Sequence, residues 1–193
     1  IEVVEASLPQ LDGLTPGERY VVCRIVRAEG DPEIAKAVGF SPGAVDLGIA
    51  AIKAKAAVVT DVRMVEVGIS KALLSRCGIT THCQIDTTNT AERAKAEGTT
   101  RSVAALRELK PHLNGAIAVV GNAPTALLAL LDMITAGAVS PALVIGMPVG
   151  FIACAESKAE LAKVDVPYIS VWERRGGSSA AAATRRQGLS KHS

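Results

Sequence analysis

Aromatic residues are scarce in this chain, since only 3% of its 193 residues are Phe, Trp or Tyr. Basic residues are not in large excess either, because the formal net charge is +2 with histidine neutral. Single-stranded nucleic acids are bound by aromatic side chains set among basic residues, and no such combination occurs here. The composition therefore argues against a nucleic-acid partner.

Cysteine is infrequent as well, with four residues in the whole chain and no Cys-x-x-Cys pair. They are Cys23, Cys77, Cys83 and Cys154. A disulfide-stabilised secreted scaffold is a poor match at this length. Cys77, His82 and Cys83 are close in sequence, but their spacing fits no common zinc pattern. We expect reduced thiols in the core of a cytoplasmic protein and no metal site.

A long uninterrupted apolar run is also missing, although 49% of the residues are hydrophobic. Residues 116–155 are the most apolar, but Asn122, Asp132 and Pro148 interrupt them. A membrane-spanning helix needs about 20 consecutive apolar residues. The opening residues include Glu2 and Glu5 and form no signal-peptide pattern. We expect buried strands and helices here, and no membrane partner.

Alternating strand and helix patterns organise most of the chain. Five short apolar runs predict strands at residues 57–60, 79–85, 116–120, 142–145 and 167–171. Helical patterns separate or follow them at residues 62–78, 90–109, 124–136, 156–164 and 178–187. This alternation predicts an α/β fold with three layers, in which a mostly parallel sheet of five or more strands has helices on both faces. We expect one domain over residues 1–193.

Two further helices are predicted before the first of these strands. Thr15-Pro16-Gly17-Glu18 is a capping-box pattern with proline at the first helical position, and that helix ends near Gly30. Ser41-Pro42-Gly43-Ala44 predicts the start of another helix, which runs to about Lys55 with Ser41 as its N-cap.

The turns that follow the strands are rich in glycine and proline. They lie at residues 60–65, 121–125, 146–151 and 174–178. In an open parallel sheet these turns share one edge, where ligands bind. Helix N-termini offer unpaired N–H groups and partial positive charge there, and glycine allows close approach to the backbone. Neither G-x-G-x-x-G nor a phosphate-loop motif occurs. With arginines nearby, this edge predicts a site for a polycarboxylate ligand rather than a nucleotide.

Seven segments in this order carry a family resemblance. They are Phe40-Ser41-Pro42-Gly43-Ala44, Asp61-Val62-Arg63-Met64-Val65, Thr100-Arg101-Ser102, Gly121-Asn122-Ala123-Pro124-Thr125-Ala126-Leu127, Gly146-Met147-Pro148-Val149-Gly150-Phe151, Glu156-Ser157-Lys158 and Arg174-Arg175-Gly176-Gly177-Ser178. Together they make the chain, beyond about Pro16, similar to the precorrin-8X methylmutases, also called precorrin isomerases, of cobalamin biosynthesis.

The resemblance implies an isomerase that moves a methyl group from C11 to C12 of a corrin precursor, a macrocycle with several carboxylates. It implies a homodimer and no cofactor. The implied substrate-binding residues are Ser41, Asp61, Arg63, Met64, Val65, Arg101, Asn122, Ala123, Pro124, Thr125, Met147, Pro148, Val149, Gly150, Glu156, Lys158, Arg175, Gly176, Gly177 and Ser178.

One position departs from the family pattern. The family carries histidine at the end of an R-M-I-H segment, and the matching stretch here is Arg24-Ile25-Val26-Arg27. Arg27 therefore stands at the implied catalytic position, but arginine stays protonated and cannot exchange a proton with a ring nitrogen. Glu29, His82 and Asp61 are other candidate proton donors. An alternative function is a divergent relative that binds a corrinoid or another polycarboxylate tetrapyrrole without isomerising it.

Overall fold

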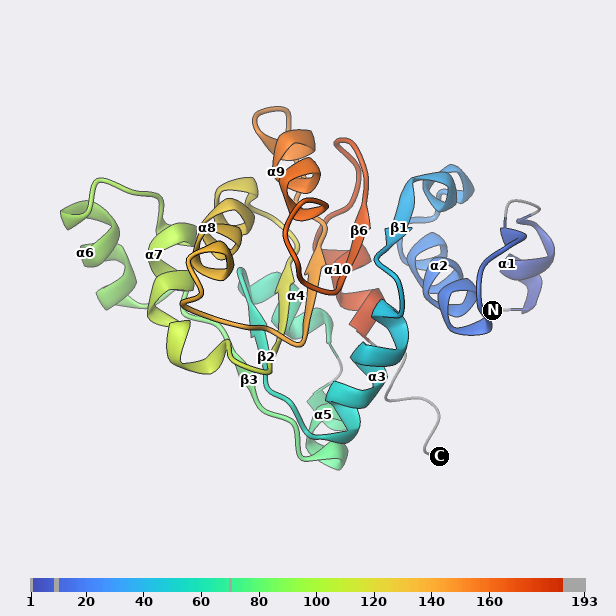
Figure 1. The fold of residues 1–193 in the computed structure, drawn as a ribbon, viewed down its shortest axis with the longest axis horizontal. Helices are drawn as coiled ribbons and strands as arrows, with labels where there is room; N and C mark the ends of the chain where they lie inside the picture. Colours follow the sequence, from blue (N-terminus) through green and yellow to red (C-terminus); the bar gives the residue numbers. More distant parts are fainter. Residues whose placement is uncertain (1, 9–10, 70, 186–193) are drawn as a thin grey trace.

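A six-stranded sheet forms the centre of the computed structural model, which describes residues 2–8, 11–69 and 71–185 (Figure 1). The strand order is β1-β6-β5-β4-β2-β3. The strands are β1 (Val38–Phe40), β2 (Val58–Thr60), β3 (Thr81–His82), β4 (Ile117–Val120), β5 (Leu143–Gly146) and β6 (Tyr168–Val171). All neighbours pair in parallel except β1, which lies antiparallel to β6.

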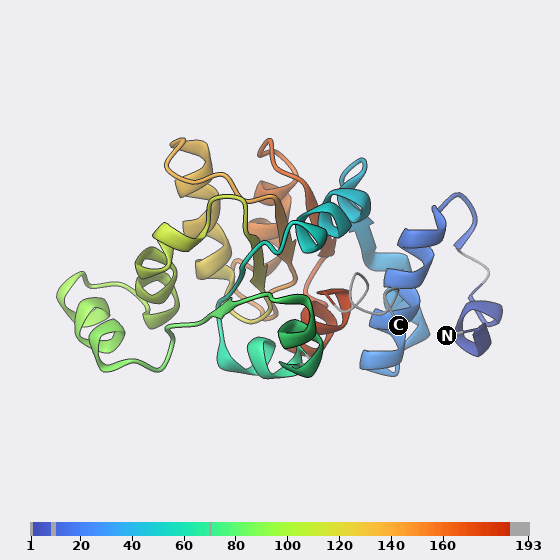
Figure 2. The same cartoon turned by 90° about the horizontal axis from the view of Figure 1, so that it is seen from below.

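Helices cover both faces of this sheet. The α-helices are α1 (Glu2–Ala6), α2 (Pro16–Glu29), α3 (Ala44–Lys53), α4 (Arg63–Gly68), α5 (Lys71–Cys77), α6 (Thr88–Ala96), α7 (Arg101–Glu108), α8 (Pro124–Thr135), α9 (Cys154–Leu161) and α10 (Ser178–Arg185). Within the part of the chain that the structure describes, the 3-10 helices η2 (Pro32–Ala37) and η3 (Lys110–His112) lie between them. Helices α6 and α1 lie at opposite ends of the long axis (Figures 1 and 2).

Alternate residues of each central strand feed two separate cores. In β4, Ile117 and Val119 pack in the core formed with α2, α3 and α10, whereas Ala118 and Val120 pack in the core formed with α7 and α8. The whole of β4 is buried. Side chains alternate across a strand, so a strand covered on both faces has no polar side and reads as a continuous apolar run.

The predicted fold class is confirmed. Each of the five predicted strands is present, with bounds that differ by one or two residues except at β3, where only Thr81–His82 are strand. Strand β1 was not predicted, because three half-buried residues that include Gly39 give little strand signal.

Two long predicted helices are each divided in the structure. The pattern over residues 62–78 forms α4 and α5, and the pattern over 90–109 forms α6 and α7. Gly98 has φ 61° between α6 and α7, and Thr100 caps α7 through its side chain. Such a left-handed residue ends one helix before the next begins. The predicted end of the last helix, at 186 and 187, lies outside the described residues.

Two helix starts were predicted before β2, and the structure confirms the start of α2 but not that of α3. Thr15 and Glu18 form the predicted capping box of α2, and Gly30 is its left-handed C-cap. Ser41 is not the N-cap of α3, so that prediction is wrong. The helix begins at Ala44 after Gly43, and the Ser41 hydroxyl instead accepts the Tyr168 N–H at 2.8 Å. Among the described residues, no helix is long and apolar enough to cross a membrane.

Candidate functional site

Asp61 ties together two of the turns at the carboxyl edge of the sheet. It follows β2 and is 1% exposed. Its two carboxylate oxygens accept the backbone N–H groups of Gly121, Asn122 and Ala123 at 3.0, 2.9 and 3.1 Å. Burial raises the pKa of Asp61, while the three N–H donors act in the opposite direction. The carboxylate therefore stabilises the turn between β4 and α8.

The next two turns are joined to this one through their backbones. Val149 donates to the Asn122 carbonyl at 3.3 Å, and Gly177 donates to the Met147 carbonyl at 2.8 Å. Gly176 has φ 128°, and a Cβ there would lie 2.7 Å from the Met147 oxygen. This glycine is thus required both by its conformation and by the close approach of the chains. The loops after β2, β4, β5 and β6 form one connected edge.

The predicted substrate-binding residues divide by exposure. Those with exposed side chains at this edge are Arg63, Met64, Arg101, Asn122, Thr125, Val149, Glu156 and Arg175. Half-buried residues are Ala123, Pro124, Gly150, Gly176 and Ser178, and buried ones are Asp61, Val65, Met147, Pro148, Lys158 and Gly177. Ser41 is half-buried as well, but it bonds to Tyr168 at the start of β6 and therefore lies at the opposite edge of the sheet. The exposed members are open to solvent and to a ligand, whereas the buried ones shape the loops.

Arg63 is exposed, but its donors are already occupied. Its guanidinium bonds to both carboxylate oxygens of Asp86, to Glu66 and, at 3.2 Å, to the Cys83 carbonyl. The hydrogen bonds that Arg63 donates to Asp86 and Glu66 raise the pKa of its guanidinium. The side chain holds α4 against the segment after β3, so a substrate contact would have to displace an existing partner.

Among the described residues, Lys158 is the largest side chain that is fully buried, and its ammonium group bonds to the loop after β6. Nζ donates to the Glu173 carbonyl at 3.0 Å and to the Arg175 carbonyl at 2.5 Å. Burial lowers the pKa of Lys158. Glu173 has φ 60°, so this turn adopts a conformation that non-glycine residues rarely take. Lys158 therefore fixes the loop that presents Arg174 and Arg175.

Those two arginines leave the loop in different directions. Arg175 forms an ion pair with Asp31 at 3.0 Å, next to the end of α2. The Arg174 guanidinium lies 5.3 Å from the ring centroid of Phe151, in the loop after β5. Phe151 and Ile152 are 84% and 87% exposed. The edge therefore combines cationic and apolar groups, which suits a flat apolar ring system that carries carboxylates.

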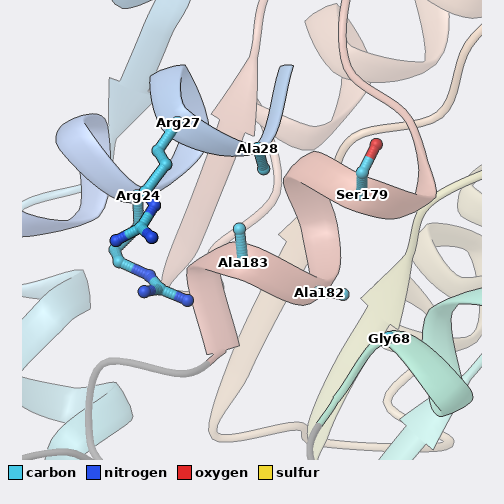
Figure 3. A pocket seen from close by; sticks show the side chains of 7 residues that line it. All are labelled: Arg24, Arg27, Ala28, Gly68, Ser179, Ala182 and Ala183. Atoms are coloured by element: carbon cyan, nitrogen blue, oxygen red, sulfur yellow. The ribbon is translucent and has the colours of Figure 1, made fainter. Parts of the chain in front are cut away.

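Arg27 lies beside this edge, on the last turn of α2. The residues around it belong to helices and not to the turns of the edge. It lines a cavity together with Arg24 and Ala28 of α2, Gly68 of α4 and three residues of α10 (Figure 3). Arg24 was not predicted as a site residue, and its i,i+3 spacing from Arg27 is the sequence signal that could have identified it.

The other candidate proton donors are all engaged. Glu29 accepts a hydrogen bond from the Ser179 hydroxyl at 2.7 Å, near the same cavity. His82 lies on edge strand β3 and stacks on His112 with ring centroids 3.9 Å apart. Burial, with the neighbouring His112, lowers the pKa of His82. Within the described ranges, no group of three His, Cys, Asp or Glu side chains could hold a metal ion.

The comparisons with known proteins agree with one another. The family model described as precorrin-8X methylmutase matches residues 1–187. The cobalt-precorrin-8 methylmutase of Priestia megaterium is 41% identical over 167 residues, which cover 86% of this chain and 74% of the relative. The precorrin-8X methylmutase of Pseudomonas aeruginosa is 42% identical over 175 residues, covering 90% and 84%. A solved precorrin-8X methyl mutase from Thermus thermophilus matches with a TM-score of 0.89 and 37% identity, covering 97% and 90%.

Proposed function

Because this chain belongs to the precorrin-8X methylmutase family and is an isomerase of that family, we propose that it moves a methyl group from C11 to C12 of a corrin precursor. The substrate class is the one named in the relatives, a precorrin-8 with or without cobalt. We place the reaction at the carboxyl edge of the sheet, beside the cavity that Arg27 lines.

The connected edge is the observation that carries this proposal. Its loops are fixed by Asp61 and Lys158, and three of them lead into helices without a side-chain cap. Val62 before α4, Ala123 before α8 and Ala153 before α9 provide no capping hydrogen bond from a side chain. By contrast, Thr15, Thr87 and Thr100 cap helices α2, α6 and α7. Uncapped N–H groups favour anions, and a corrin precursor presents several carboxylates to such an edge.

The reaction fits a site of this kind. A 1,5-sigmatropic methyl shift breaks one C–C bond and forms another within the same molecule, so the enzyme needs no redox partner. Positioning the ring and stabilising its charge distribution can lower the barrier. Arg27 would act as a fixed cation that pairs with a substrate carboxylate or donates to a ring nitrogen.

A second function has one specific observation in its favour. Arg27 stands where the family has a histidine, and general acid catalysis by such a group is typically worth about 10²- to 10⁴-fold in rate. A protein that lost this contribution could retain the binding site alone. The alternative is therefore a corrinoid-binding relative that does not isomerise its ligand.

We also propose that the protein acts as a homodimer. Exposed large apolar side chains at the edge, Phe151 and Ile152 among them, support a contact with a second copy. Sedimentation velocity at micromolar concentration tests this proposal. A species of twice the chain mass is expected, and a monomer alone would contradict it.

Incubation with precorrin-8, and separately with cobalt-precorrin-8, tests the catalytic proposal. An isomerisation leaves the mass of the tetrapyrrole unchanged while the absorption spectrum becomes that of a corrin. The form that is converted identifies the metal content of the substrate. Binding of both forms without any spectral conversion would support the binding-protein alternative instead.

A further inference from the structure

A cavity of about 370 Å³ opens between α2, α10 and α4. Figure 3 shows Arg24 and Arg27 extending from α2 on the same side, toward the part of α10 that carries Ala183. The remaining lining residues are Ala28, Gly68, Ser179, Ala182 and Ala183. These are small side chains, so the space between the helices is left open instead of being filled.

The charge lining this cavity is entirely positive. Arg24 and Arg27 are the charged residues among those that line it, and they are one helical turn apart. Neither forms an ion pair within the part of the chain that the structure describes. The nearest acidic residue along α2, Glu29, already accepts the Ser179 hydroxyl. Two neighbouring guanidinium groups of like charge therefore face the same space, and neither is paired with a carboxylate of the described residues.

Arg24 adds a second, independent sign of a missing partner. Its Nε atom is buried and has no hydrogen-bond partner among the described residues. A buried N–H that is not hydrogen-bonded costs free energy and needs an explanation in the site around it. A carboxylate in the cavity suits the Arg24 guanidinium, since its two oxygens match the forked N–H donors of such a group.

We propose that Arg24 and Arg27 together bind one carboxylate arm of the substrate in this cavity, through the guanidinium groups that they bring to its lining. This inference rests on the proposed polycarboxylate substrate. We call the pair Arg24 and Arg27 the clamp. It gives Arg27 a role that the family's histidine does not have, because a neutral imidazole carries no positive charge to pair with a carboxylate. The clamp anchors the macrocycle from the α2 side, while the loops of the sheet edge contact the rest of it.

Equilibrium titration with cobyrinic acid, a corrinoid with free carboxylates, tests the clamp, and its heptamethyl ester is the matched ligand without those charges. Arg24→Gln and Arg27→Gln should each weaken binding of the acid by about 10- to 100-fold. Affinity for the ester should stay the same in all variants. The control Arg107→Gln removes one charge on α7, where Arg107 pairs with Glu97, and should bind the acid as the wild type does.

The double variant shows whether the two arginines share one carboxylate. Removing both should weaken binding by much less than the product of the two single losses, since one contact is lost only once. Losses that multiply fully would overturn the shared site, and so would wild-type affinity in both single variants. Arg27 is exposed, so Arg27→Gln keeps the test valid even if Arg24→Gln unfolds.

If the wild type binds cobyrinic acid and the glutamine variants bind it equally well, the clamp is wrong while the corrinoid site stands. If the wild type binds neither cobyrinic acid nor the precorrin substrate, the proposed function fails and the clamp fails with it.

Discussion

The carboxylate of Asp61 accepts the backbone N–H of Asn122 at 2.9 Å, although the two residues are 61 positions apart in the sequence. The same carboxylate accepts the N–H groups of Gly121 and Ala123 on either side. Asp61 thus satisfies three successive donors of the turn before α8, which would otherwise be left without a partner at the buried end of a strand. The turn keeps its shape because a neighbouring strand supplies this one side chain.

The first prediction follows from these three bonds. Asp61→Ala should lower the free energy of unfolding by about 2–4 kcal/mol, because buried N–H groups lose their acceptor. Urea unfolding followed by circular dichroism measures this loss. Asp165→Ala, which removes an exposed carboxylate from a surface turn, should change stability by less than about 0.5 kcal/mol. Equal stability of the two variants would contradict the role given to Asp61.

The second prediction concerns Arg101, the exposed first residue of α7. Arg101→Ala should weaken corrinoid binding by about 10- to 100-fold, as expected for loss of one charged hydrogen bond. Arg93→Ala is the matched control, because Arg93 lies on α6 and pairs with Glu97 at 2.6 Å. Titration with cobyrinic acid compares the two variants. Equal affinities would refute the placement of α7 at the site.

The third prediction concerns pH and the stacked pair of His82 and His112. The pKa of His82 is lowered from its usual 6.5, so the folded protein binds a proton there less readily than the unfolded chain does. The neutral form of His82 therefore contributes to stability above the pKa that this group has in the unfolded chain. The contribution is lost as the pH falls from that value through the lower pKa of His82 in the folded protein. The melting temperature should therefore drop between about pH 7 and about pH 5, the range in which histidine titrates.

His82→Gln removes the titrating group and should flatten that part of the pH profile. His112→Gln should flatten it partly, because burial is the main cause of the lowered pKa of His82 and His112 adds to it, while Glu66 acts in the opposite direction. A wild-type slope that persists in His82→Gln would show that another group is responsible.

Much of the architecture could be predicted because its signals are local. Continuous apolar runs such as Ile117 to Val120 indicate strands buried on both faces, and the capping box at Thr15 fixes the start of α2. Strand β1 and the role of Ser41 could not be predicted, since both depend on pairing with β6 more than 120 positions away. Long-range pairing leaves no periodic trace in the sequence.

The sequence predicts where the candidate site lies on the sheet, but it predicts the surroundings of single side chains less well. The glycine- and proline-rich turns locate the edge, because parallel strands bring their carboxyl ends together. Sequence patterns do not reveal that Lys158 is buried against the Glu173 carbonyl, or that Arg63 is occupied by Asp86. The i,i+3 spacing of Arg24 and Arg27 indicates that they lie on one face of α2. It does not reveal the cavity that they share, since that depends on the small residues of α10.

The fourth prediction restores the residue type that the family carries. If Arg27 replaced a proton donor, Arg27→His should raise the rate of the methyl shift, mainly below about pH 7, where an imidazole of ordinary pKa is protonated. Single-turnover rates measured across pH detect this gain. If Arg27 instead anchors a carboxylate, the same variant should bind substrate more weakly, with a rate that is unchanged or lower.

Nuclear magnetic resonance of a substrate labelled with ¹³C in its C11 methyl group follows the proposed methyl shift itself. With enzyme in excess over precorrin-8, we expect the methyl signal at C11 to disappear and a signal from a methyl group on C12 to replace it. The tetrapyrrole should keep its mass, and the conversion should follow the appearance of the corrin spectrum. A label that stays on C11 while the ligand is fully bound would contradict the assignment as a methylmutase.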